Sequence, residues 1–152
     1  MIKVIAFIVL VSVLFLIYVL RRNPVKKIPV LHIGGNIQSD PLEYYRLETP
    51  YATTQTGRDL LISDYHLYII RGSSDVGNKL HLYHGDCILV DDKIKEVSDT
   101  YKAYLVEEFP EFSARKGTII LPKSEIKQDN RIIGAIVSKI PSEYMQKYRK
   151  QI

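Results

Sequence analysis

The sequence predicts a mostly β protein. A single N-terminal transmembrane helix is expected to precede a small rolled β-sheet or barrel domain that ends in a short C-terminal helix. Three features predict this: an apolar run near the N-terminus, five β-rich segments from Leu60 onward, and one helical pattern at the end of the chain. We expect a transmembrane anchor over 1–22, a juxtamembrane linker over 23–30 and a mostly-β soluble domain over 31–152.

The apolar run reads VIAFIVLVSVLFLIYVL from Val4 to Leu20, and its only polar groups are the hydroxyls of Ser12 and Tyr18. With the preceding residues it reaches the roughly 20 residues that cross about 30 Å of hydrocarbon. A cleaved signal peptide is the alternative, but it needs small residues at a cleavage site. The run continues instead into YVLRRNPVKK, which favours an uncleaved single-pass anchor.

Basic residues flank the apolar run unevenly. Lys3 precedes it, and four cations follow it: Arg21, Arg22, Lys26 and Lys27. The positive-inside rule therefore places the C-terminal domain in the cytoplasm, with these four cations near anionic lipid headgroups. The single cysteine, Cys87, agrees with that compartment because it cannot form an internal disulfide.

The net charge of +4 comes from this flank. Five of the 21 basic residues lie in the anchor and its flank, which leaves 16 basic against 17 acidic groups in residues 31–152. Because the basic and acidic groups of the domain nearly cancel, its charge does not favour nucleic-acid binding.

Five segments rich in Ile, Val, Leu, Tyr and Phe predict the strands of the domain: 60–71, 79–92, 101–109, 112–121 and 131–140. In the second of them, Leu80 and Leu82 and then Ile88 and Val90 alternate with polar residues, as in half-buried strands.

The two ends of the domain carry different patterns. Residues 31–59 are rich in Gly, Pro and Thr and predict short strands and loops. Residues 142–152 look helical, with Ser142 as an N-cap and Glu143 and Lys147 as an i,i+4 pair.

The loop GSSD at 72–75 is the first candidate for chemistry. A serine nucleophile needs an exposed loop, a nearby base and donors for the oxyanion, and this loop supplies two serines and a glycine between predicted strands. The alternative is a Gly-Ser turn capped by Asp75, a common composition for turns.

The order of features around this loop resembles the peptidase domain shared by LexA-type repressors and type I signal peptidases. The resemblance covers 69–140: Gly-x-Ser ending at Ser74, then Gly85 and Asp86 opening a hydrophobic strand, then ILPKS at 120–124 and IIGAIVSKI at 132–140. It implies a Ser/Lys dyad with Ser74 as the nucleophile. Asp75 stands where that family has Met, and the spacing to Gly-Asp is eleven residues, two longer than usual.

The lysine base has more than one candidate. The resemblance implies Lys116 in FSARKG, and Lys102 is a second option. Matched without a gap, Arg115 takes the lysine position, and an arginine stays protonated and cannot act as a base.

Histidines are the other candidate group. His81, His84 and Asp86 lie close in HLYHGD, with His66 upstream, and could in principle hold Zn²⁺. Residues i and i+3 on a strand point to opposite faces, so exposed strand histidines are the favoured interpretation. We expect no metal and no cofactor.

Two function classes follow, and the first is favoured. One is a membrane-anchored β-domain that binds a protein or peptide partner, with catalysis weak or lost. The other is an active membrane-bound serine peptidase that uses Ser74 and Lys116. A third option is an unrelated small β-barrel with a structural or assembly role.

Overall fold

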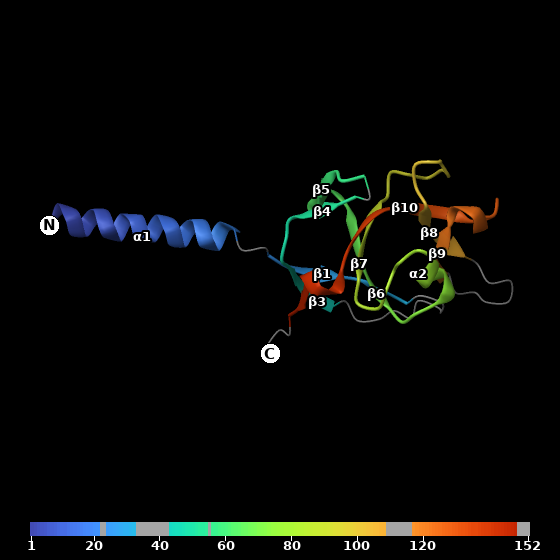
Figure 1. Cartoon of the computed structure of the whole chain (residues 1–152), viewed down its shortest axis with the longest axis horizontal. Coiled ribbons are helices and arrows are strands. Elements are labelled where there is room, and N and C mark those ends of the chain that lie inside the picture. The colour runs from blue at the N-terminus through green and yellow to red at the C-terminus, as the bar shows by residue number, and fades with distance from the viewer. Residues whose placement is uncertain (22–23, 33–42, 55, 109–116, 149–152) are drawn as a thin grey trace.

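The computed structural model describes residues 1–21, 24–32, 43–54, 56–108 and 117–148. Helix α1 (Ile2–Arg21) projects from one side of a β-domain (Figure 1). Its side chains are described as far as Tyr18.

Among the described residues, no helix has both the length and the hydropathy needed to cross a membrane.

Most of the domain belongs to a six-stranded sheet. Its order is β2 (Val30–His32), β6 (His66–Arg71), β7 (Cys87–Asp91), β10 (Arg131–Ile140), β8 (Ala103–Glu108) and β9 (Gly117–Pro122). All pairings are antiparallel except β2 with β6. The sheet curls around on itself (Figure 1), and among the described residues β2 and β9 are its two edges, so this part of the chain forms an open roll. The prediction of a mostly-β, rolled domain is confirmed.

Two smaller sheets lie beside the large one. Strands β1 (Val25–Ile28), β3 (Glu43–Leu47) and β11 (Met145–Lys147) form one of them, and β4 (Tyr51–Thr53) pairs with β5 (Asp59–Leu61) in a hairpin. The short helices are α2 (Asp75–Lys79) and the 3₁₀ turns η1 (Ile62–Asp64), η2 (Lys123–Glu125) and η3 (Ser142–Tyr144).

The central strand β7 is buried on both faces, which explains its uninterrupted apolar sequence CILV. Cys87 and Leu89 belong to a core shared with the three-stranded sheet, whereas Ile88 and Val90 belong to a core on the other face. Its neighbour β10 approaches it closely at Gly134, where a Cβ would lie 2.5 Å from the carbonyl oxygen of Asp91.

The predicted linker over 23–30 is wrong for most of its length. Val25–Ile28 pairs with β3 and Val30 begins β2, so the domain starts almost directly after α1. The two prolines that suggested a linker fit this arrangement: Pro24 precedes β1, and Pro29 lies where the chain leaves one sheet for the other. The segment is extended, as expected, but its backbone is paired.

The predicted C-terminal helix is also wrong within the described residues. The chain forms η3 and then β11, which pairs antiparallel with β3. Ser142 is the first residue of η3, whose N-cap is Pro141 and not the predicted Ser142, and Met145 packs against the core. Pairing with β3 together with burial of Met145 outweighs the local helical preference.

The strand predicted over 79–92 exists only from Cys87 onward. Leu80 follows the end of α2, and Leu82 is buried in a turn, so their alternation does not belong to a strand. The predictions for 101–109 and 131–140 correspond to β8 and β10. Within 112–121, residues 112–116 lie outside the described part, and the remainder falls in β9.

Candidate functional site

The loop from Gly72 to Asp86 contains the short helix α2, and Ser74 is its N-cap. Ser74 has extended backbone angles, and its hydroxyl oxygen accepts a hydrogen bond from the Gly77 amide at 3.0 Å. An N-cap serine satisfies one of the amide groups that the first turn of a helix leaves without a partner. The residue predicted as nucleophile therefore has a structural function in this fold.

The other end of α2 is closed by a Schellman motif. The Leu82 amide donates to the Gly77 carbonyl at 2.8 Å, and the His81 amide donates to the Asn78 carbonyl at 3.2 Å. His81 lies in the left-handed region, with φ +55°, at the position where glycine is usual. The sequence pattern predicts a loop and the start of a strand here, but the structure has a five-residue helix that is capped at both ends.

The Gly-Asp pair after this helix forms a tight junction. Gly85 has φ +91°, and a Cβ there would lie 3.0 Å from the Cβ of Ser142. Asp86 is only 4% exposed. Its Oδ1 accepts from the Ser142 amide at 3.1 Å and its Oδ2 from the Tyr83 amide at 3.0 Å. The carboxylate thereby joins the turn before β7 to the chain after β10.

Lys139 on β10 supplies the opposite charge. Its Nζ lies 3.3 Å from Asp86 Oδ2 and also donates to the His81 carbonyl oxygen. The same amine lies over the Tyr83 ring, 5.1 Å from the centroid, at a distance typical of a cation–π contact. Lys139 is the lysine that the structure brings to this loop, although the sequence had not singled it out.

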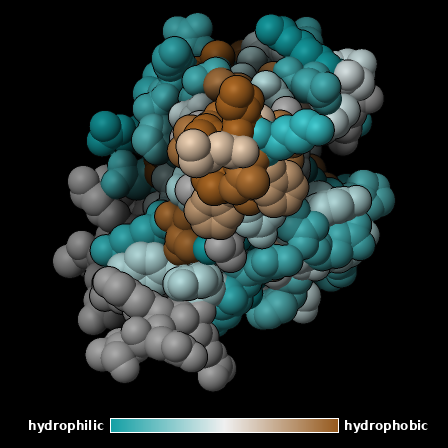
Figure 2. All heavy atoms as spheres, turned by 90° about the vertical axis from the view of Figure 1, so that its left-hand side faces the viewer, coloured by the Kyte–Doolittle hydropathy of each residue, from teal (hydrophilic) through white to brown (hydrophobic). Residues whose placement is uncertain are grey.

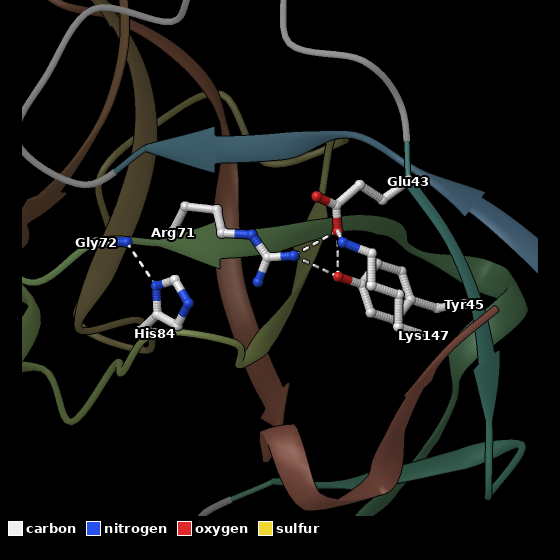
Figure 3. A network of polar contacts seen from close by, with 6 residues as sticks. All are labelled: Glu43, Tyr45, Arg71, Gly72, His84 and Lys147. Atoms are coloured by element: carbon white, nitrogen blue, oxygen red, sulfur yellow. Dashed lines mark hydrogen bonds and ion pairs between the residues drawn. The ribbon is translucent and has the colours of Figure 1, made fainter. Parts of the chain in front are cut away.

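A second polar cluster holds the beginning of the loop (Figure 3). Arg71, the last residue of β6, donates to Glu43 and to the Tyr45 hydroxyl on β3, the latter at 2.6 Å. Tyr45 in turn donates to Glu43, and Lys147 on β11 lies 3.4 Å from the same carboxylate. This cluster fastens the end of β6 to the three-stranded sheet.

The neighbours of Glu43 stabilise the charged form of its carboxylate. Burial by itself raises the pKa of Glu43, but the hydrogen bond from Tyr45 and the charges of Arg71 and Lys147 outweigh burial and hold the pKa below its ordinary value. Burial and the Glu43 contact raise the pKa of the Tyr45 hydroxyl, which therefore remains a donor.

His84 closes the base of the loop. Its Nδ1 accepts a hydrogen bond from the Gly72 amide at 2.9 Å (Figure 3). An accepting Nδ1 is unprotonated, so the hydrogen of the neutral ring resides on Nε2. The Nδ1 atom of His84 is therefore engaged by a backbone amide.

Of the predicted dyad of Ser74 and Lys116, the structure describes only Ser74. Lys116 and Arg115 both lie outside the described residues. Lys102 is exposed just before β8, and within the described part of the chain no hydrogen bond or ion pair joins it to Ser74. Of the three residues considered for the position of the base, the structure therefore describes only Lys102, which makes no hydrogen bond or ion pair with Ser74.

The histidines do not form a metal site in the described ranges. No group of three or more His, Cys, Asp or Glu side chains there is arranged to hold an ion. His66 instead pairs with Asp92 at 3.0 Å, and His81 Nδ1 lies 3.3 Å from the Tyr83 hydroxyl.

Comparison of the chain with protein-family models, with curated proteins and with solved structures finds no match. The assignment of a function therefore depends on this chain's own geometry.

Asp86 gives the first prediction. Asp86→Ala removes the acceptor of two backbone amides and leaves Lys139 without its carboxylate, so we expect the free energy of unfolding to fall by about 3 kcal/mol. Asp86→Asn keeps one acceptor oxygen, so its free energy of unfolding should lie between the values of Asp86→Ala and the native chain. Denaturant unfolding of the full chain in detergent micelles measures the difference.

The control is Asp59→Ala, which removes an exposed carboxylate that accepts from the Thr53 hydroxyl. It should change the free energy of unfolding by less than about 0.5 kcal/mol. Equal effects of the two alanine variants would show that Asp86 does not join the two segments.

Proposed function

We propose that this protein is a single-pass, membrane-anchored β-domain that binds a protein or peptide partner at the membrane surface without cleaving it. The observation that carries the non-catalytic part is the use of the Ser74 hydroxyl as the N-cap of α2. Different observations support the membrane anchor, the orientation of the domain and the surface that binds the partner.

The support for the anchor is the uniform apolarity of α1. Its large apolar side chains, from Ile2 to Tyr18, are exposed on all sides of the helix rather than on one stripe. The described part of α1 does not by itself meet the length and hydropathy of a spanning helix. The proposal rests on the whole apolar run of the sequence, which continues to Leu20; at 1.5 Å per residue, 20 helical residues extend about 30 Å, the thickness of a bilayer core. Figure 2 looks along α1, whose apolar side chains project toward the viewer in front of the more hydrophilic surface of the domain.

The charges that follow α1 favour a cytoplasmic domain. Lys26 and Lys27 lie on β1, close behind Arg21 and Arg22 in the sequence, and Lys27 is exposed. This cluster favours the side of the membrane that bears anionic lipid, and its four cations are the residues we propose to contact the headgroups.

The partner surface that we propose is the outer edge of β9. This strand ends the six-stranded sheet and is six residues long, whereas β2 at the opposite edge has three. An edge strand offers backbone donors and acceptors to which an extended peptide can add as a further strand. Helix α2 lies against β9, so the capped loop borders this edge.

The alternative is an active serine peptidase. The specific observation in its favour is the sequence of elements around Ser74: a short helix beginning after the serine, the buried Gly-Asp junction, and β9 alongside. In that mechanism Lys116 would accept the proton of the Ser74 hydroxyl, which requires the lysine amine to be neutral and buried.

Two Ser74 variants separate the structural function from catalysis. Ser74→Ala should lower the free energy of unfolding by about 1 kcal/mol because the cap is lost, whereas Ser74→Asn keeps a capping oxygen and should stay near the native value. We expect both variants and the native chain to show the same background cleavage of a mixed peptide library. A stable Ser74→Asn variant that has lost measurable cleavage activity would establish the peptidase instead.

Photocrosslinking tests the partner surface. A photoreactive amino acid at Thr118 on β9 should give a discrete adduct in membranes that contain the full chain. The matched control is the same group at Lys93, an exposed turn position after β7, which should give none. Equal yields from both positions, or no adduct at Thr118, would contradict binding at this edge.

Thiol labelling tests the orientation. Burial raises the pKa of the Cys87 thiol to about 12, so this buried thiol does not react with a maleimide at neutral pH. In Lys93→Cys, an impermeant maleimide should label the chain only after the cells are opened. In Lys3→Cys it should label intact cells, and the reverse pattern would overturn the orientation.

A further inference from the structure

The β4–β5 hairpin has an outer face that changes character along its length. At one end Tyr51 and Leu61 stand opposite each other and are 53% and 41% exposed, and the next pair along the hairpin, Ala52 and Leu60, is buried. At the other end Thr53 pairs with Asp59, and the threonine hydroxyl donates to the carboxylate at 2.9 Å. One face thus runs from an apolar pair to a polar pair.

The apolar end of the hairpin lies beside the base of α1. A hollow of about 160 Å³ with a mostly apolar lining lies between this end of the hairpin and Pro24, and it is lined by Pro24, Lys26, Leu47, Thr49, Pro50, Leu61, Ile62 and Ser63. Pro24 is only three residues beyond Arg21, so the chain places it at most about 10 Å from the helix end. Leu61 therefore borders the region into which α1 leads.

We propose that the Tyr51–Leu61 end of this hairpin, together with the hollow, rests on the interface of a bilayer that contains anionic lipid. This inference deepens the proposed function and rests on its membrane anchor. The hairpin would be a second contact with the bilayer, beside the helix, and would limit the tilt of the domain over the membrane.

Three properties favour a lipid surface as the occupant. Tyrosine prefers the headgroup layer, and an exposed leucine gains by entering it. Lys26 lines the hollow and Lys27 is exposed on the same strand, which complements anionic headgroups. The polar pair at Thr53 and Asp59 lies at the other end of the face, where water would remain.

The test compares two positions on one strand. Leu61→Cys and Asp59→Cys place a thiol on the same face of β5, about 7 Å apart along the strand. Each full-length variant is labelled with an environment-sensitive fluorophore and reconstituted in bilayers of phosphatidylcholine with phosphatidylserine, and the buried Cys87 stays unlabelled. Aqueous iodide should quench the fluorophore at position 61 several-fold less than at position 59.

Equal quenching at the two positions would overturn the proposal. Tyr51→Cys and Thr53→Cys repeat the comparison on β4, so it remains decisive if one variant does not fold. Bilayers of phosphatidylcholine alone should reduce the difference between positions, because the lysines would lose their counter-charges; an unchanged difference would overturn the requirement for anionic lipid.

A separate measurement distinguishes failure of this inference from failure of the anchor. A chain that alkaline carbonate removes from the bilayers is not anchored, and the proposed function then falls together with this inference. A chain that resists extraction but shows equal quenching at positions 59 and 61 keeps its anchor and lacks the second contact.

Discussion

The buried carboxylate of Asp86 is the interaction on which the arrangement around the central strands depends. Its two oxygens accept hydrogen bonds from Tyr83 and Ser142, and Lys139 supplies a compensating charge. A carboxylate with this little exposure needs such partners because burial removes its hydration. The bonds join the turn before β7 to the segment after β10, so one residue holds the end of the antiparallel pair at which Cys87 faces Ile140.

The Gly-Asp pair that suggested a peptidase therefore has a structural explanation of its own. Gly85 provides a positive φ and room for Ser142, and Asp86 provides the junction. Ser74 likewise caps a helix. A relative that keeps such a framework while losing catalysis would look the same over these residues, and for this reason the Ser74→Asn variant, rather than Ser74→Ala, separates the two functions.

The short connection between α1 and the sheet couples the domain to the proposed anchor. Because β1 begins at Val25 and pairs with β3, little free chain separates the helix from the core. With the anchor we propose, a domain tethered this closely would keep one side toward the membrane, and the further proposal assigns to that side the hollow next to Pro24 and the exposed pair of Tyr51 and Leu61. The polar cluster of Arg71, Glu43 and Lys147 secures the three-stranded sheet that carries the connection.

The sequence by itself determined the apolar N-terminal helix and the positions of β8 and β10, because an apolar run and β-rich segments leave the chain few other ways to bury their side chains; for β7 it determined only the apolar stretch from Cys87. Only the tertiary structure decided the segments whose local patterns were ambiguous. The alternation at Leu80 and Leu82 belongs to the end of a capped helix, since Asp86 and His81 bend the chain there. The helical pattern after Ser142 became a strand because β3 offered a free edge and the core had a place for Met145. The pairing of β11 with β3 joins residues about 100 positions apart, which no local pattern encodes.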